Sequence, residues 1–398
     1  MGLPAKVKYN FLCFLISILL TGCSTFLQPV QEKELIKTGF AFNTTYTITL
    51  SAGGSEDLLE ECVAMCQKFE KVFSRTLKGS ELYNINEIEK AYLKVSDKLG
   101  IDNTLNTKNS KKGNNGNIFT GGENREAAEA EIKALADPGN KAVFDLNNDG
   151  SIEFIVSDIL YEILERGLYY SEISEGVFDI TIEPESSLWD FISDNRRVPE
   201  DKKIKEAVKL TGYKNASLKD KKLVLKIPGM GIELGAIAKG FIADKLKEHL
   251  KENGVTSGTV NLGGNVLCIG KKTDGSPFRI GIQHPFENRN EVITAIKAED
   301  ISVVSSGVYE RYFMQDGKMY HHILDPSTGY PYNNGLVAIT VISGKSVDGD
   351  ALSTTCFAMG LEKGMEFANS LDSVYALFIT EDGKLHYSEG FKEMETGN

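Results

Sequence analysis

The sequence predicts an α+β fold for this chain. Segments that alternate as β-strands do are mixed with amphipathic helical segments, without the regular strand–helix–strand order of a doubly wound parallel sheet. The chain has 398 residues, 41% of them hydrophobic and 25% charged, so it is long enough for one large domain or two. Its formal net charge is −12 and it has no basic stripe, which argues against nucleic-acid binding.

The N-terminus has the pattern of an export signal. Lys6 and Lys8 precede an uncharged apolar run over residues 11–20. A bilayer span needs about 20 apolar residues, so this run predicts the core of a signal peptide rather than a transmembrane helix. The string LTGC follows and ends at Cys23, which resembles a bacterial lipobox. A plain secretory signal with a chance cysteine is the alternative.

These features predict a lipid-anchored protein. We expect a signal peptide over residues 1–22, a diacylglycerol on the Cys23 thiol and a tether over residues 23–40. The mature chain is acidic and gains nothing from anionic headgroups, so the lipid would hold it at the membrane. The expected location is the outer face of the cytoplasmic membrane or the periplasm.

The first half of the chain predicts one strand and three helices. Residues 43–50 alternate as a strand does, and Ser55 has the position of an N-cap for a helix that ends near Arg75. The pattern breaks after the segment that runs from Ser80 to Asn86, and residues from about 100 to 123 have the polar, glycine-rich composition of a loop. Two more helices are expected, at residues 123–136 and 157–173.

The second half predicts short strands mixed with two helices. One helix is expected from about Leu234 to Asn253, and another begins near Asp348. Strands are expected at residues 223–227, 259–268, 278–283, 293–298, 301–305, 337–342 and 374–380. Cys62 and Cys66 are four residues apart in a helical pattern, which predicts that both face the core. The cysteines show no metal-site spacing and do not indicate a disulfide framework, although export would permit one.

Residues 145–156 resemble the first half of an EF-hand or dockerin calcium loop. Asp145, Asn147 and Asp149 stand at positions one, three and five, and a glycine follows at six. Position twelve is Val156, where a bidentate carboxylate is needed. A turn rich in aspartate and asparagine that leads into a helix is therefore favoured over a calcium site.

Asp350 and Thr354 form the first pair with a candidate chemical role. They are four residues apart near the start of an expected helix, so the carboxylate and the hydroxyl would lie on one face. Hard oxygen donors at this spacing suit Mg²⁺ or Ca²⁺. Taken alone, an N-cap aspartate followed by a helical threonine is the simpler explanation.

Lys239 stands between Gly235 and Gly240 at the start of another expected helix. Glycine permits the close approach of a ligand, a helix N-terminus attracts phosphate, and the lysine supplies a cation. The alternative is that the glycines serve helix packing and the lysine extends to solvent.

His322 lies in the string HHILDPSTGYP, in a chain that contains only five histidines. A histidine followed by an aspartate three residues later is a candidate base with an orienting carboxylate. A structural loop histidine is the alternative. The pair Gly263 and Gly264, and separately Ser306, are weaker candidates for contact with a ligand.

The order of these segments is more specific than any one of them. Ten blocks occur in the order found in one enzyme family: FNTTYTITL, SELYNIN, GVFDITIEP, SLWDF, ELGAIAKGFIADKL, VNLGGN, FRIGIQHP, SSGVYERYF, YHHILDPSTGYP and DGDALSTT. They lie within residues 43–86 and 157–380, give or take a residue at the ends. The chain therefore resembles the FAD:protein FMN transferase family, also called ApbE, in which a lipobox is typical.

The resemblance implies a fold and a reaction. The expected architecture is two-lobed, related to the T-fold, with FAD bound between the lobes. It implies a catalytic domain over residues 41–395 with an insertion at about 92–150. Family members use a divalent ion, usually Mg²⁺, to transfer FMN from FAD to a Thr or Ser hydroxyl of an acceptor protein, and AMP leaves. The acceptor implied by the resemblance is a membrane redox subunit.

The resemblance also assigns roles to residues. The side chains of Asp350 and Thr354 and the backbone carbonyl of Ala236 would hold Mg²⁺, or Ca²⁺ as the second choice. Lys239 would position the flavin nucleotide, and His322 would take the acceptor proton or steady the phosphates. The FAD site would further be lined by Tyr46, Asp179, Gly263, Gly264 and Ser306.

The chain departs from the family pattern at four positions. Phe42 and Asn43 replace a Met-Gly pair, Glu233 replaces an Asp, and Ser305 replaces a Thr. None of these changes removes a proposed metal ligand. Asn43 would alter the approach of the backbone to the flavin.

Three other functions stay open. Attack by water in the same site would make the protein a metal-dependent FAD pyrophosphatase that gives FMN and AMP. A flavin-binding lipoprotein without turnover would not need the set Asp350, Thr354 and His322. A structural calcium-binding protein built on residues 145–156 is disfavoured by the missing ligand at Val156.

Overall fold

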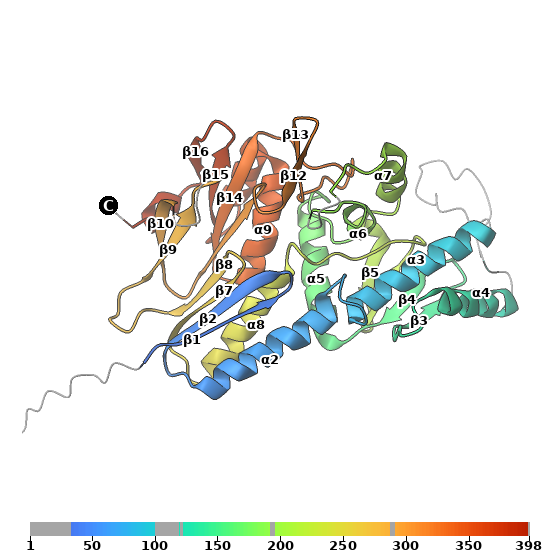
Figure 1. The fold of residues 1–398 in the computed structure, drawn as a ribbon, viewed down its shortest axis with the longest axis horizontal. Coiled ribbons are helices and arrows are strands. Elements are labelled where there is room, and N and C mark those ends of the chain that lie inside the picture. Colours follow the sequence, from blue (N-terminus) through green and yellow to red (C-terminus); the bar gives the residue numbers. More distant parts are fainter. Residues whose placement is uncertain (1–32, 100–118, 120–121, 192–195, 287–290, 397–398) are drawn as a thin grey trace, which may run out of the picture. The chain divides into compact units, whose positions relative to one another are not determined.

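The computed structural model describes residues 33–99, 119, 122–191, 196–286 and 291–396 (Figure 1). Residues from Glu34 on belong to one unit. Its larger sheet has eight strands in the order β1-β2-β7-β8-β11-β14-β15-β16, and a second sheet has the order β3-β4-β6-β5. The strand pairs within each sheet are antiparallel, and helices are interspersed among the strands, so the expected α+β class is confirmed.

Each sheet combines strands from distant parts of the chain. The larger sheet contains β1 (Leu35–Ala41), β2 (Thr44–Ala52), β7 (Ser257–Leu262), β8 (Asn265–Gly270), β11 (Ser302–Gly307), β14 (Leu336–Ser343), β15 (Tyr375–Thr380) and β16 (Leu385–Tyr387). The four-stranded sheet contains β3 (Val143–Leu146), β4 (Ile152–Ile155), β5 (Ala216–Lys219) and β6 (Lys222–Leu225). Two separate hairpins are β9 (Phe278–Gln283) with β10 (Val292–Ala298) and β12 (Tyr312–Gln315) with β13 (Lys318–His321).

The helices lie between and around these sheets. They are α2 (Glu56–Phe73), α3 (Glu81–Leu99), α4 (Gly122–Leu135), α5 (Asp158–Ile173), α6 (Glu183–Ser186), α7 (Asp201–Val208), α8 (Ala238–Glu252), α9 (Ser346–Met359) and α10 (Leu361–Asn369). Short 3₁₀ turns are η1 (Tyr213–Asn215) and η2 (Phe391–Met394). Among the described residues, no helix combines the length and apolar character needed to cross a bilayer.

Several expected elements are found where local signals placed them. Ser55 caps α2 by accepting a hydrogen bond from Leu58 N, and Ser157 caps α5 in the same way through Leu160 N. Cys62 and Cys66 are both fully buried on α2, as their spacing predicts. Their thiols are free, as are those of the other described cysteines.

Three expectations are corrected. The helix α3 lies where the pattern was expected to break, because its buried face includes polar residues that hide the helical period. Residues 259–268 form two strands, β7 and β8, since the Gly263–Gly264 pair makes a tight turn with positive φ angles of 59° and 91°. The expected C-terminal bound of a tether at residue 40 is wrong, because β1 begins at Leu35 and pairs with β2.

The candidate calcium loop is a hairpin turn between β3 and β4. Asp149 Oδ1 accepts hydrogen bonds from Ser151 N at 3.0 Å and from Ser151 Oγ at 2.7 Å, so the aspartate closes the turn. Lys222 Nζ lies 2.8 Å from Glu153 Oε2. The turn leads into a strand rather than the expected helix. The described part of the chain contains no group of three His, Cys, Asp or Glu side chains placed to hold a metal ion.

Helix α9 is the central helix of the unit. It packs against β11 and β14 of the large sheet on one side and against α8 and α10 on others, and nearly all of its residues are buried. The buried residues of the helix nevertheless include Asp350, Ser353 and Thr355. Buried polar side chains need hydrogen-bond partners, so each of these constrains the elements packed around α9.

Glu185 on α6 gives a testable consequence for stability. Its side chain is fully buried, and burial raises its pKa from 4.5 to about 8. The folded state thus favours the protonated acid. This contribution to stability is complete below about pH 4.5 and is lost as the pH rises through 8.

We expect Glu185→Gln to be close to the wild type in melting temperature at pH 5 and to melt at a higher temperature than the wild type at pH 9. Thermal unfolding at both pH values checks this. Glu362→Gln, an exposed position on α10, serves as the control. A Glu185→Gln variant with the same pH profile as the wild type would contradict the assignment.

Candidate active site

A cavity of about 1360 Å³ opens beside the N-termini of α8 and α9. Drug-sized ligands usually occupy pockets of about 300–1,000 Å³, so this cavity has room for a large ligand and part of a second one. The β1–β2 turn, the end of α2, residues 177–191, β9, and the segment after β13 also contribute to its wall. The predicted site residues that line it are Asp179, Ala236, Lys239, Gly263, Gly264, Ser306, His322, Asp350 and Thr354.

Asp350 is a nearly buried carboxylate, 3% exposed, in the first part of α9. Its Oδ2 accepts a hydrogen bond from Gly240 N at 3.0 Å, and its Oδ1 lies 3.2 Å from Lys239 Nζ. Gly240 is required here, because a Cβ at this position would lie 2.2 Å from the backbone oxygen of Ser346. The two helices therefore meet backbone to backbone at the carboxylate.

Lys239 connects this carboxylate to the loop before α8. Its ammonium group also donates to Gly235 O at 3.2 Å. A cation thus already lies between a carboxylate and a backbone carbonyl, next to Ala236. Two oxygen acceptors thus lie within hydrogen-bond distance of this ammonium group.

The donor set fits a hard divalent cation. Asp350 supplies one carboxylate, Thr354 a hydroxyl one turn later on the same helix, and Ala236 a backbone carbonyl, and all three line the cavity. Mg²⁺ in proteins is commonly held by one or two carboxylates, with substrate phosphates and waters completing the shell. A single carboxylate beside a large cavity matches that pattern.

His322 has a defined tautomer. Its Nδ1 lies 3.3 Å from Arg311 O, and its backbone N–H donates to the same carbonyl at 3.2 Å. A carbonyl oxygen only accepts, so Nδ1 carries the proton and Nε2 is the acceptor nitrogen of a neutral ring. Burial lowers the pKa of His322 to about 3, with a further contribution from the positive charge of Arg311.

Ser306 and Asp179 also line the cavity, and their hydrogen bonds hold its wall in place. Ser306 Oγ lies 2.8 Å from Ser353 Oγ, which ties β11 to α9. Asp179 accepts from Thr181 N, Thr181 Oγ1 and Tyr213 N, and burial raises the pKa of its carboxyl group. The carboxylate of Asp179 therefore organises a turn at the cavity wall.

Tyr46 is placed differently from the expectation. It is 6% exposed and packs in the core, where its ring covers Gly39 of the neighbouring strand, and it is not a lining residue of the cavity. Side chains alternate across a strand, so Thr45 and Thr47 face the cavity instead. The structure therefore does not support Tyr46 as an FAD-site residue.

The backbone conformation of Asn43 accounts for one departure of the chain from the family pattern. Phe42 and Asn43 form the two-residue turn between β1 and β2, with φ angles of 55° and 57°. Positive φ favours glycine, and asparagine tolerates it better than most other residues. The substitution therefore preserves the turn, and both residues line the cavity.

Two cationic residues of the wall were not among the predicted site residues. Arg311 donates from a guanidinium nitrogen to Asn43 O at 3.4 Å, and Arg75 at the end of α2 pairs with Glu233. Arg311 lies inside the block SSGVYERYF, so its place in that block was the available signal. Arg75 gave no local signal, because its partner is remote in sequence.

Comparisons with known proteins agree with this geometry. The family model described as "ApbE family" matches residues 124–378. Over 243 residues the chain is 37% identical to the FAD:protein FMN transferase of Klebsiella pneumoniae strain 342. The matched region covers 60% of this chain and 75% of that protein. The FAD:protein FMN transferase of Treponema pallidum is 34% identical over 276 residues, 65% of this chain and 76% of that protein.

Solved structures show the same likeness. The ApbE protein of Thermotoga maritima matches with a TM-score of 0.70 and 29% identity, and the match covers 92% of this chain and 100% of that one. The flavin transferase ApbE of Vibrio cholerae matches with a TM-score of 0.69 and 25% identity, over 91% and 99% of the two chains. The chain belongs to the ApbE family.

The tautomer of His322 can be measured. With ¹⁵N-labelled histidine, we expect one side chain to keep the shifts of a neutral ring protonated at Nδ1 from pH 5 to pH 8, since the pKa of His322 is lowered to about 3. The signal is assigned by its loss in His322→Gln. Imidazolium shifts for this residue at pH 6 would contradict the geometry.

Proposed function

We propose that this protein transfers the FMN half of FAD to a Thr or Ser hydroxyl of an acceptor protein, with Mg²⁺ as the required ion. The observation that supports it best is the convergence of Asp350, Thr354, Ala236, Lys239 and His322 on one large cavity, in a chain of the ApbE family. The relatives from Klebsiella pneumoniae and Treponema pallidum are named FAD:protein FMN transferases.

The metal would be held by Asp350, Thr354 and the Ala236 carbonyl, with Ca²⁺ as a second choice. When bound, such an ion neutralises charge on the pyrophosphate and on the transferred phosphoryl group. Lys239 lies beside the same carboxylate and would bind a phosphate oxygen once the metal shares Asp350. The two cations together favour the binding of a polyanionic ligand at this end of the cavity.

His322 would act on the acceptor. The acceptor hydroxyl oxygen forms a bond to the FMN phosphorus, and its proton goes to His322 Nε2. The bond between that phosphorus and the bridging oxygen breaks, and AMP leaves with the bridging oxygen. The low pKa of the ring reflects burial near cations. Phosphate oxygens beside it would raise that pKa towards the range of a general base.

The export signal and lipobox expected at the N-terminus support proposals for the location of the protein and for its acceptor. A lipid on Cys23 would place the enzyme at the outer face of the cytoplasmic membrane or in the periplasm. We propose a membrane redox subunit as the acceptor, because it would be presented at the same surface. Cys23 lies outside the residues that the structure describes.

The experiment uses purified protein with FAD and Mg²⁺, with and without a candidate acceptor. AMP release is followed together with the intact mass of the acceptor. AMP and an acceptor heavier by one FMN moiety would support the proposal. AMP with free FMN and an unmodified acceptor would favour the pyrophosphatase. FAD that stays bound without AMP release would favour a flavin-binding protein.

Asp350→Ala should abolish transfer, because it removes the only carboxylate of the proposed metal site. Asp348→Ala is the matched control, since Asp348 lies on the same helix but pairs with Arg166. We expect the control to keep transfer activity at saturating Mg²⁺. Equal activity of both variants would contradict the metal assignment.

Cys23→Ala should leave transfer by the purified protein intact and release the protein from the membrane. Partition between membrane and soluble fractions of cells checks the second part. A variant that stays with the membrane would show that the lipobox interpretation is wrong.

A further inference from the structure

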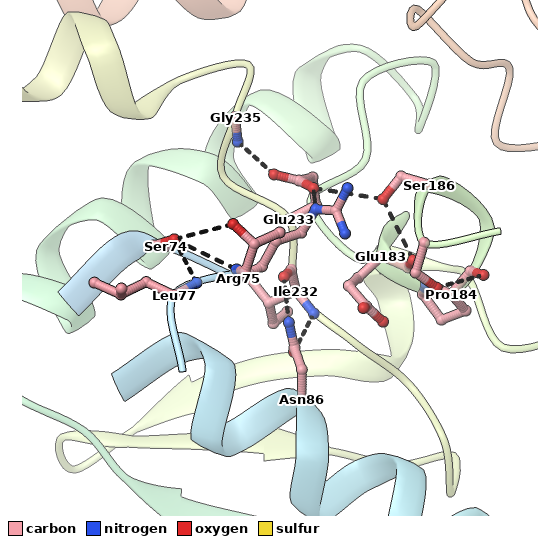
Figure 2. A network of polar contacts seen from close by, with 12 residues as sticks. Ser74, Arg75, Leu77, Asn86, Glu183, Pro184, Ser186, Ile232, Glu233 and Gly235 are labelled. Carbon is pink, nitrogen blue, oxygen red and sulfur yellow. Dashed lines mark hydrogen bonds and ion pairs between the residues drawn. The ribbon is translucent and has the colours of Figure 1, made fainter. Parts of the chain in front are cut away.

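The loop that precedes α8 has little regular structure, yet it carries Ala236. Side chains from α3 hold its first half. Glu89 Oε2 accepts from Gly229 N at 2.9 Å. Asn86 accepts from Ile232 N and donates to Ile232 O, both at 2.9 Å, so it replaces a strand partner for this residue (Figure 2). Both side chains are buried.

Glu233 holds the second half of the loop. Its Oε1 accepts from Gly235 N at 2.9 Å, one residue before the Ala236 carbonyl. Its Oε2 pairs with Arg75 and lies 3.4 Å from Ser186 Oγ (Figure 2). Its own backbone N–H donates to Ile180 O at 2.8 Å. A single side chain thus links the loop to the end of α2 and to α6.

The positive charge of Arg75 acts on two carboxylates, those of Glu233 and Glu183. Glu183, 3% exposed, lies near it and pairs with Lys90 at 3.2 Å. Burial raises the pKa of Glu183, while Lys90 and Arg75 act in the opposite direction and Glu233 adds to the rise. Without Arg75, Glu233 would be repelled by Glu183 and would lose the partner that fixes its orientation.

The pair contributes little to global stability. The side chains of Arg75 and Glu233 are 26% and 21% exposed and line the cavity, so solvent screens part of their attraction. Its main effect is therefore local, on the direction of the peptide groups at Gly235 and Ala236.

We propose that Glu233, held in place by Arg75, is a positioning residue that orients the Ala236 carbonyl toward the metal. The inference rests on the proposed function only for the identity of the metal site. Loss of side chains that orient metal ligands typically weakens metal affinity about 10–100-fold. Glu233→Ala should therefore weaken Mg²⁺ binding about 10-fold or more.

The test measures Mg²⁺ binding to the FAD-loaded protein by calorimetry, without an acceptor, and FAD binding in chelator. Glu233→Ala and Arg75→Met should weaken Mg²⁺ binding by a clearly larger factor than they weaken FAD binding in chelator. Glu233→Asp, which keeps the charge, should recover part of the affinity. Glu162→Ala is the control, because it removes an exposed ion pair with Lys245.

Amide hydrogen exchange gives a readout that needs neither metal nor FAD. We expect faster exchange at Gly235 in Glu233→Ala, with the rate at Gly229 unchanged because Glu89 still binds it. Wild-type affinity for Mg²⁺ in a folded Glu233→Ala would overturn the inference, as would a lower melting temperature without any change in Mg²⁺ affinity.

The outcomes separate this inference from the proposed function. A wild type that binds FAD and Mg²⁺ but modifies no acceptor would contradict the transferase and leave the positioning role in place. A wild type that modifies an acceptor, beside a Glu233→Ala variant with unchanged Mg²⁺ affinity, would overturn the positioning role alone. A wild type that binds no Mg²⁺ would overturn both.

Discussion

The site depends on one buried charge, the carboxylate of Asp350. A carboxylate removed from water is strongly destabilising unless hydrogen bonds and an opposite charge compensate it. Here the compensation comes from the Gly240 N–H at the start of α8 and from the Lys239 ammonium group. Both require the backbones of α8 and α9 to touch, which the absence of a side chain at Gly240 permits. The placement of Asp350 and Lys239 at the cavity wall follows from this contact.

The same helix pair is fixed by a second carboxylate. Asp244 on α8 accepts from the backbone N–H groups of Ser346 and Val347, both at 2.9 Å, and so caps the N-terminus of α9. Burial raises its pKa to about 6. From the other side, Arg166 of α5 pairs with Asp348. That pair has access to solvent, so the contacts with α8 contribute most to the orientation of α9.

The predicted α+β class is confirmed, and most of the predicted site residues line one cavity, but individual elements and contacts were missed. The spacing of Asp350 and Thr354 and the glycines around Lys239 have local signals, and the structure places these residues at one cavity. Helix α3 was missed because Asn86 and Glu89 are buried for the sake of a loop remote in sequence, which disrupts the apolar period. The resemblance assigned Tyr46 to the FAD site, but packing turns its side chain into the core and leaves Thr45 and Thr47 at the cavity. The pairing of Arg75 with Glu233 has no local signal at all.

Crystals of the FAD complex grown with Mn²⁺ in place of Mg²⁺ would locate the ion through its anomalous scattering. We expect one peak about 2.0–2.3 Å from an Asp350 carboxylate oxygen, the Thr354 hydroxyl and the Ala236 carbonyl, with pyrophosphate oxygens completing the shell. The Lys239 ammonium group should then lie against a phosphate oxygen. A peak elsewhere, or an Asp350 that still pairs only with Lys239 while FAD is bound, would contradict the metal site.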